Sequence, residues 1–393
     1  MLSDTSRPVI EATLPIIAER IGEITKKFYA GLFAEHPGLL DGTFSRANQR
    51  NGSQQKALAG AIAAFASHLL RNPDTLPEAV LARIAHKHAS LGIVEEQYPV
   101  VYEHLFAAIA DDLGEAVTPA VAAAWSEVYW LMADALIKIE KGLYSRQANG
   151  EMWTPWSLVS REPAGTGSVT FRFAPADGTP VTVAEPGQYV SIRIAVEDGL
   201  RQCRQYSLSD AVASTTERVF TTKLDGDGEV SPFLHNNLRV GDVVELSNPY
   251  GDITIDATSD APIVLATAGI GCTPSASALQ SLADGSSQRR ILVLHAEQNA
   301  ESWALREQML GSVDSLPNAE LRLWLETQDP TGGIGSTPGL MDLSTVDFPE
   351  GAFLYLCGPL PFMRAIRSQA IAGGVPAERI HYEVFGPDLW LAA

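Results

Sequence analysis

The stretch PIVLATAGIGCTP, residues 262–274, sets the organisation of the C-terminal third of the chain. Its first half is short and apolar, as in a strand buried on both faces, and its glycines and proline then open a helix. Further apolar runs follow at the spacing that intervening helices require. They are ILVLHA (291–296), LRLWLE (321–326), AFLYLC (352–357) and IHYEVF (380–385). Strands that alternate with helices predict an α/β domain with a mainly parallel sheet over residues 260–393.

The preceding segment, residues 152–259, has a period of two instead. Val169, Phe171 and Phe173 alternate with polar residues, and turn sequences such as DGDG (225–228) separate runs of this kind. Such alternation is typical of strands with one buried face. We therefore predict an antiparallel β domain, either a barrel or a sandwich.

The N-terminal segment, residues 1–147, is helical in pattern throughout. It is rich in Ala, Leu, Glu and Lys, and apolar residues such as Leu58, Ile62 and Phe65 recur at spacings of three and four. Thr118-Pro119 is the pair expected at a helix start. The chain is thus predicted to be multidomain, with an all-α, an antiparallel β and an α/β part in that order.

Composition excludes several classes of protein. The 393 residues are 46% hydrophobic and 19% charged, a globular composition long enough for two or three domains of roughly 150 residues. No apolar run approaches the ~18–20 residues of a membrane span, and no export signal precedes the first acidic residues. A net charge of -19 disfavours nucleic acid as a partner. Three scattered cysteines exclude four-cysteine metal sites and fit a reducing compartment, so we expect a cytoplasmic protein without an integral membrane segment.

One histidine of the helical segment lies on a predicted buried face. His88 continues the apolar stripe of Leu81 and Ile84, whereas His86 points away from that stripe. A core histidine bonded to a backbone carbonyl would explain His88, and so would a ligand to a buried metal or haem iron. Tyr29 and Gln54 also fall at inner positions. Buried polar groups need partners, and a haem pocket with a bound diatomic would supply them.

The segments FYAGLF (28–33), TFSRANQRNGSQQKAL (43–58) and IAHKHASLGI (84–93) resemble the globin domain of bacterial flavohaemoglobins. The resemblance implies a haem b whose iron, the metal of the site, is bound by His88. It implies a distal hydroxyl from Tyr29 and hydrogen-bonding partners of His88 at Tyr98 and Glu140. It also implies haem-pocket contacts from Phe44, Gln54 and Leu58. From the residues alone, Tyr98 remains open as an ordinary core tyrosine and Glu140 as a solvated helix residue.

Three segments of the β domain, EPGQYVSIRI (185–194), RQYSLS (204–209) and GEVSPFLHNNLRVGDVVEL (228–246), are similar to ferredoxin-reductase-like flavin domains. The resemblance implies a β barrel that binds FAD. Arg204 would pair with the pyrophosphate, since its guanidinium is bidentate and always charged, and Tyr206 would pack on the flavin ring. The rest of the implied FAD site comprises Gln188, Tyr189, Gln205, Ser207, Gly228, Val230, Ser231, Glu383 and Phe385. From the residues alone, Arg204 could also be an arginine at a strand edge, and Tyr206 could be an ordinary core tyrosine.

The segments ATAGIGCTP (266–274) and CGPLPFM (357–363) each follow a strand. Glycines let the backbone approach a pyrophosphate at a helix N-terminus, although the third glycine of GxGxxG is missing here. Together the two segments resemble the nicotinamide signature of the reductases. The resemblance implies NAD(P)-binding by Gly269, Gly271, Thr273, Pro274, Cys357, Gly358 and Pro359. Cys357 alone could equally be a small buried residue, and Glu297 favours NADH over NADPH because an acid repels a 2′-phosphate.

The resemblance covers essentially the whole chain in the order globin, flavin and nicotinamide domain. It implies a monomeric flavohaemoglobin with nitric oxide dioxygenase activity, in which NAD(P)H, FAD and haem convert NO and O2 to nitrate. A reductase for flavins, quinones or ferric complexes with a regulatory globin is the alternative, and an oxygen sensor is a further one. The sequence departs from the family at Cys272, where relatives have glutamine, and in the apolar tail LWLAA (389–393).

Overall fold

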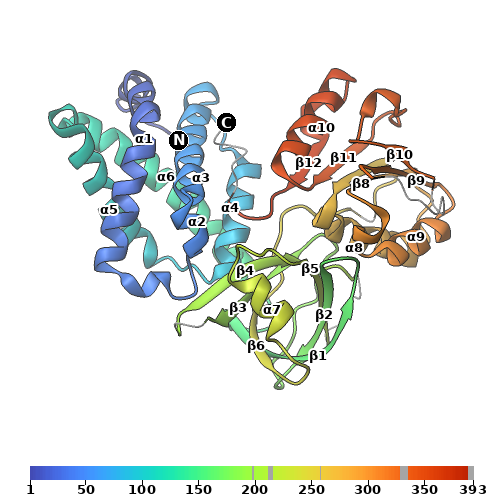
Figure 1. The fold of residues 1–393 in the computed structure, drawn as a ribbon. Coiled ribbons are helices and arrows are strands. Elements are labelled where there is room, and N and C mark those ends of the chain that lie inside the picture. The colour runs from blue at the N-terminus through green and yellow to red at the C-terminus, as the bar shows by residue number, and fades with distance from the viewer. Residues whose placement is uncertain (197–198, 211–215, 257, 328–334, 388–393) are drawn as a thin grey trace. The chain divides into compact units, whose positions relative to one another are not determined.

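The computed structural model describes residues 1–196, 199–210, 216–256, 258–327 and 335–387, so the apolar tail lies outside the described residues. The chain forms two compact units. Figure 1 draws the fold with the colour running from the N-terminus to the C-terminus. One unit comprises Met1–Trp153, Arg193–Arg204 and Gly386–Ala393, and the other comprises Thr154–Ile192 and Gln205–Phe385. The three domain boundaries at 147, 152 and 259–260 stay a prediction.

Helices make up the N-terminal part, as the periodicity predicted. Thr118 caps one of them, because its hydroxyl accepts a hydrogen bond from the Val121 N–H at 3.3 Å. Gly92 ends another in the left-handed region, with φ of 74°. The helices are α1 (Arg7–Glu35), α2 (Arg46–Arg50), α3 (Ser53–Arg71), α4 (Glu78–Leu91), α5 (Gln97–Leu113) and α6 (Pro119–Ser145), with short 3₁₀ turns η1 (Pro37–Leu40) and η2 (Gly114–Ala116).

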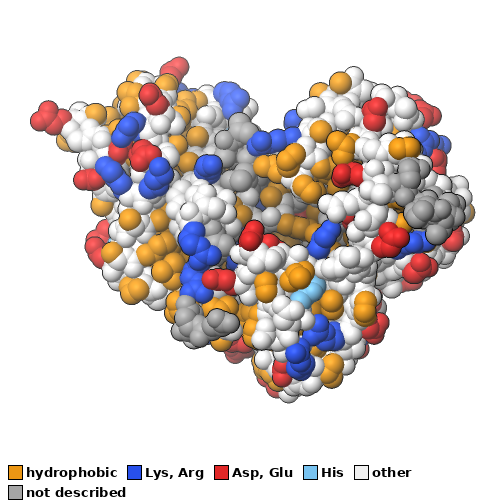
Figure 2. Space-filling model, in the orientation of Figure 1, with side chains coloured by type: hydrophobic (Ala, Val, Ile, Leu, Met, Phe, Trp, Pro, Cys, Tyr) orange, Lys and Arg blue, Asp and Glu red, His pale blue; other side chains and the backbone are white. Residues whose placement is uncertain are grey.

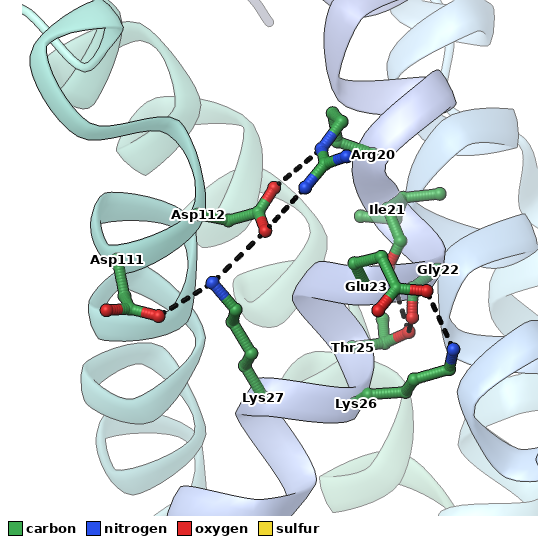
Figure 3. A network of polar contacts seen from close by, with 9 residues as sticks. All are labelled: Arg20, Ile21, Gly22, Glu23, Thr25, Lys26, Lys27, Asp111 and Asp112. Carbon is green, nitrogen blue, oxygen red and sulfur yellow. Dashed lines mark hydrogen bonds and ion pairs between the residues drawn. The ribbon is translucent and has the colours of Figure 1, made fainter.

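Helices α1 and α5 are joined by ion pairs as well as by apolar packing. The Arg20 guanidinium donates to both carboxylate oxygens of Asp112 at 2.9 Å. Lys27 contacts Asp111 at 2.7 Å and Asp112 at 3.2 Å, and Figure 3 shows the whole network. Basic and acidic side chains are also interspersed over the visible face of these helices in Figure 2. The network therefore adds a small electrostatic contribution to the packing of α1 against α5.

Helix α6 is the one helix, within the part of the chain that the structure describes, long and apolar enough to cross a membrane by length and composition alone. Glu127 and Asp134 interrupt its apolar sequence, which is why no continuous run of that length is present. The helix packs against α1 and α4 and buries Trp125 and Val128. A core helix passes the same test.

The antiparallel sheet contains β1 (Trp153–Pro163), β2 (Ser168–Pro175), β3 (Tyr189–Ala195), β4 (Arg201–Ser207), β5 (Arg218–Lys223) and β6 (Val243–Ser247). Its strand order is β4-β3-β6-β1-β2-β5. An antiparallel bridge between Leu208 and Phe220 joins the end of β4 to β5, so the two edges of the sheet meet. Phe171, Phe173 and Phe220 are buried inside it. The structure therefore confirms the antiparallel β prediction in its barrel form.

The second sheet is parallel, as predicted for the C-terminal third. It contains β7 (Ile263–Ala268), β8 (Ile291–Glu297), β9 (Ala319–Leu325), β10 (Thr337–Pro338), β11 (Phe353–Cys357) and β12 (Ile380–Glu383). The strand order β10-β9-β8-β7-β11-β12 reverses direction between β7 and β11. Open α/β sheets bind ligands beyond the carboxyl ends of strands at such a reversal. The glycine segments after β7 and β11 lie there.

Helices follow these strands in the order that a βαβ pattern requires. They are α8 (Cys272–Asp284), α9 (Arg306–Ser315) and α10 (Leu360–Ala372), while α7 (Val230–Asn236) belongs to the antiparallel region. Between α8, α9 and the sheet, the apolar core includes Leu265, Leu279, Val293, Trp303 and Met309. Backbone pairing sets the register of β7 against β11, from Ile263 opposite Phe353 to Thr267 opposite Cys357.

Candidate functional site

The structure brings His88, Tyr98 and Glu140 together from α4, α5 and α6. Nδ1 of His88 lies 2.8 Å from Oε1 of Glu140 and 3.1 Å from the Tyr98 hydroxyl. The Tyr98 hydroxyl donates to the same carboxylate oxygen at 2.6 Å. Glu140 is only 2% exposed. A buried carboxylate needs donors, and here it has two, so Glu140 is not a solvated helix residue.

Protonation follows from this network. Burial, and next to it the Glu140 charge, raises the pKa of Tyr98, so its hydroxyl keeps its proton and donates. A carboxylate can only accept, so Nδ1 of neutral His88 carries the hydrogen and Nε2 carries the lone pair. Within the described residues Nε2 of His88 has no hydrogen-bond partner. An imidazole held from behind by a carboxylate fits a haem iron ligand.

Tyr29 on α1 is a second buried polar residue in the unit that contains His88. Burial raises the pKa of its hydroxyl. The Gln54 side chain hydrogen-bonds that hydroxyl from α3 and opposes this effect. Leu58 lies one turn further along α3 and is partly buried. Tyr29 and Gln54 therefore lie next to each other, and their roles in a haem pocket stay a prediction.

Aromatic rings enclose Tyr29. Phe33 stacks against it with ring centroids 5.6 Å apart, and Phe44 meets it edge-on at 5.9 Å. Phe33 and Phe44 also contact each other at 5.3 Å. Sequence reasoning did not place Phe33 in the pocket. Its spacing of four from Tyr29 on one helix face was the available signal.

The predicted flavin residues from Arg204 to Ser207 all lie on β4. The Tyr206 ring stacks on Phe220 at 5.2 Å with an interplanar angle of 12°. Gln205 donates from Nε2 to the Ser191 hydroxyl at 2.9 Å, and Ser207 is buried. The Arg204 guanidinium donates to the carbonyl of Cys203 at 2.7 Å. The arginine is therefore presented at the strand with its charge unneutralised by this contact.

Gln188 and Tyr189 precede β4 in the barrel. The carbonyl of Gln188 accepts from Leu208 at 2.9 Å, and Tyr189 pairs with Tyr250 through the backbone. The backbone of Gln188 is thus bonded directly to the residue that follows RQYS. These contacts place the two predicted segments side by side.

Hydrogen bonds within the DGDG turn (225–228) and to its neighbours stabilise the turn before α7. Gly228 donates to the Asp225 carbonyl at 3.1 Å. The Ser231 hydroxyl accepts from the Asp225 N–H at 2.8 Å and donates to the Lys223 carbonyl at 3.1 Å. Val230 is fully buried as the first residue of α7. The turn is therefore held in one conformation at the end of β5.

The two glycine segments of the parallel sheet touch each other. A Cβ at Gly271 would lie 2.4 Å from the Cys357 carbonyl oxygen and 2.7 Å from the Gly358 nitrogen. Gly269 adopts a left-handed φ of 56°. Packing against the other segment thus gives Gly271 a structural reason in addition to the ligand approach expected from the sequence. The loops after β7 and β11 form one surface, with Pro359 exposed beside it.

Cysteines line the inside of this surface. Burial raises the pKa of the Cys272 thiol to about 12, and its thiol contacts the Ala304 carbonyl at 3.4 Å. Burial, with Glu383 next, also raises the pKa of Cys357. Cys357 and Glu383 are paired across β11 and β12, which joins a predicted nicotinamide residue to a predicted flavin residue. Both thiols are protonated packing groups at neutral pH.

The remaining predicted residues also belong to the C-terminal part of the chain. Thr273 is buried and donates to the Ile270 carbonyl at 3.1 Å, and Pro274 follows it in the first turn of α8. Phe385 is 46% exposed two residues after β12. Glu297 is buried at the end of β8, and burial raises its pKa.

Family comparisons follow the same division of the chain. The globin profile matches residues 26–136, and the oxidoreductase NAD-binding domain profile matches residues 265–368. A flavohemoprotein of Rhizobium meliloti (strain 1021) is 38% identical over 407 residues, which cover 99% of this chain and 100% of that protein. A flavohemoprotein of Chromobacterium violaceum is 39% identical over 98% of each chain. The similarity thus extends from end to end.

Solved structures are similar to this chain in the same way, one of them over nearly its whole length. A crystal structure of a flavohemoglobin from Malassezia yamatoensis with bound FAD and heme matches with a TM-score of 0.93 at 43% identity. The match covers 98% of this chain and 100% of that one. The FAD/NAD-binding domain of a nitric oxide dioxygenase from Vibrio cholerae covers 60% of this chain and 99% of its own length, with 33% identity and a TM-score of 0.55.

Proposed function

Since this chain belongs to the flavohemoprotein family, we propose that it is an NAD(P)H-dependent nitric oxide dioxygenase that converts NO and O2 to nitrate. In this proposal the helical unit holds haem b and the two sheets hold FAD and NAD(P)H. The FAD and heme bound in the Malassezia yamatoensis flavohemoglobin support two of these cofactors, and the match to the NAD-binding domain supports the third. The proposal depends above all on one observation, the buried contact of His88 with Glu140 and Tyr98.

That contact is what an electron-accepting haem site needs from its protein. When bound, FAD would divide the electron pair of NAD(P)H into single electrons, and haem iron would use them in oxygen chemistry. His88 would bind the iron through Nε2. Glu140 would hold the proton on Nδ1 and give the imidazole partial imidazolate character, which strengthens electron donation. Tyr98 fixes the position of that carboxylate.

Tyr29 would act on the diatomic substrate. Its hydroxyl keeps its proton because burial raises the pKa, and the Gln54 side chain lies beside it. That hydroxyl would donate its hydrogen to a substrate that becomes partly negative, an electrostatic role. Tyr29 is only 5% exposed, and the rings of Phe33 and Phe44 pack against its ring. The Tyr29 hydroxyl would therefore act as a donor in a pocket that aromatic rings and one amide surround.

The experiment is NADH-driven NO consumption by the full holoprotein in aerated buffer, with nitrate measured as the product. Tyr29→Phe removes the hydroxyl and keeps the ring. We expect a loss of NO turnover of about 10²–10³-fold, the usual effect of removing one such donor. Tyr102→Phe is the matched control, because that hydroxyl donates to Ser126 outside the pocket.

The rival reductase activity predicts a different outcome. Reduction of ferric complexes or quinones by NADH would then exceed NO consumption, and Tyr29→Phe would leave all rates unchanged. Nitrate formation at the wild-type rate in Tyr29→Phe would remove the proposed role of that hydroxyl. Absence of NADH-dependent nitrate formation by the wild-type holoprotein would overturn the proposed function itself.

A further inference from the structure

A cluster of possible metal ligands lies at the end of α1, outside the haem-pocket residues. Glu35 and His36 come from the C-terminal end of α1 and the residue after it, and His104 comes from α5. One ligand atom from each lies within 4.8 Å of the other two. The two helices are already joined by the Arg20–Asp112 pair. The cluster is thus on a stable helix pair.

His104 is the fixed member of the cluster. It is only 8% exposed, and its Nδ1 lies 2.9 Å from the Val100 carbonyl. A carbonyl can only accept, so Nδ1 carries the hydrogen and neutral His104 has its lone pair on Nε2. Nε2 is buried without a hydrogen-bond partner among the described residues. The nearest carboxylate oxygen, from Glu35, is 3.5 Å away.

This arrangement is what a metal-binding histidine requires. Such histidines usually donate their second ring N–H to a carbonyl or carboxylate, which fixes the tautomer and the ring orientation. An unpartnered buried acceptor is uncommon and calls for an explanation. An ion bound at Nε2 of His104 would satisfy it.

His36 and Glu35 supply the accessible side of the cluster. The His36 ring meets the His104 ring edge-on with centroids 5.2 Å apart. Its backbone N–H donates to the Leu32 carbonyl at 2.8 Å, which fixes the residue at the helix end. The Glu35 side chain is 73% exposed and can turn toward Nε2. The last turn of α1 contains no basic residue, so a cation there meets the negative end of the helix dipole.

We propose that Glu35, His36 and His104 bind a divalent transition-metal ion of the Zn²⁺ type, with water in the remaining position. Two imidazole nitrogens and one carboxylate oxygen are a common set for such ions. Ligands about 2 Å from zinc lie roughly 3.3 Å from one another, so small side-chain rotations close the present spacing. The ion would link α1 to α5 two helical turns from Tyr29. The proposal is independent of the nitric oxide activity.

The experiment is calorimetric titration of ZnCl2 into chelator-treated holoprotein at pH 7.5 in a weakly coordinating buffer. We expect a binding event with one Zn²⁺ per chain that weakens at least tenfold in His36→Ala and in Glu35→Gln. Both side chains are accessible, so these variants should fold. His68→Ala is the matched control, because that exposed histidine at the end of α3 contacts Thr75 instead. It should bind Zn²⁺ as the wild type does.

The ligand atoms are tested separately by zinc X-ray absorption, which haem and flavin do not obscure. We expect imidazole scattering from two ligands in the wild type, from fewer in His104→Gln, and no sulfur. Affinity should also fall with decreasing pH, because protons compete for the imidazoles. No Zn²⁺ binding, or equal affinity in His36→Ala and wild type, would overturn the proposal and leave a shared proton between His104 and Glu35. A sulfur ligand would overturn it equally.

Discussion

Two regions of the molecule use different atoms. One is the haem pocket, which comprises the His88–Tyr98–Glu140 network and the surroundings of Tyr29. The other is the glycine surface, formed by the loops after β7 and β11. In the pocket, the working atoms are side-chain atoms of His88, Tyr98 and Glu140 on three separate helices. At the glycine surface, Gly271 works by having no side chain, so that the backbone at Cys357 can approach. Chemistry can therefore be removed from the pocket without disturbing the fold, whereas at the glycine surface fold and binding change together.

The largest expected effect separates His88 from its neighbour His86. The two side chains lie about 200° apart around the helix, since each residue turns by about 100°. His88→Ala should lose essentially all haem, while His86→Ala should keep it. The haem content per chain, from the Soret absorbance, measures this, with circular dichroism to verify that helices persist. Equal loss of haem in both variants would show that α4 as a whole, rather than one imidazole, binds it.

The next largest effect is expected at Gly271, where the absence of a side chain lets two backbone segments approach each other. Gly271→Ala should destabilise the parallel-sheet region by about 1–3 kcal/mol or more, because the new Cβ overlaps backbone atoms that cannot rotate away. Nucleotide binding should weaken in parallel. Gly311→Ala is the matched control, since that glycine lies inside α9 with no atom within 4 Å of the added Cβ. It should be neutral or stabilising by about 0.5–1 kcal/mol. The midpoints of urea unfolding of the two variants measure this difference in stability. Equal midpoints for Gly271→Ala and Gly311→Ala would contradict the packing argument.

A smaller effect is expected when the pocket loses a charge but keeps its shape. Glu140→Gln retains an oxygen that accepts from Tyr98 and His88. The imidazole would lose its negative partner, so the haem reduction potential should rise and NO turnover should fall by about 10–100-fold. Haem content should stay near the wild-type level. Potentiometric titration of the haem gives the result, and an unchanged potential would mean that Glu140 is structural only.

The same contrast explains how much could be predicted from sequence. Alternating residues identified the antiparallel strands, and apolar spacings of three and four identified the helices, because one face of each of these elements is buried. Short continuous apolar runs identified the parallel strands, because both faces of that sheet are covered. They could not decide Glu140, which flanks the apolar stripe of α6 and becomes buried only when α4 and α5 supply its donors. The resemblance to the family placed it; helix periodicity alone could not.

Two other features depend on contacts between distant segments. The packing role of Gly271 requires the loop after β11, more than eighty residues later in the chain. The contact of His36 with His104 requires the pairing of α1 with α5, and periodicity identifies the inner face of a helix but not its partner. His104 next to Leu105 on the inner face of α5 was the only local signal. Long-range pairing is the information that one sequence lacks.

The smallest effect concerns a polar network that serves the fold alone. Hydrogen bonds from Arg20 and then from Lys27, together with the charges of both, hold the pKa of Asp112 below its usual value. A depressed folded-state pKa stabilises the protein above the unfolded value of about 3.9, and this contribution disappears as pH falls through the folded value. Asp112→Asn should therefore lower the thermal midpoint of the helical signal at pH 7 and lose that difference toward pH 3, with haem content unchanged. Asp111→Asn should lower it less, because that carboxylate is 72% exposed and contacts Lys27 alone. A pH-independent difference would mean that Asp112 acts through packing rather than charge.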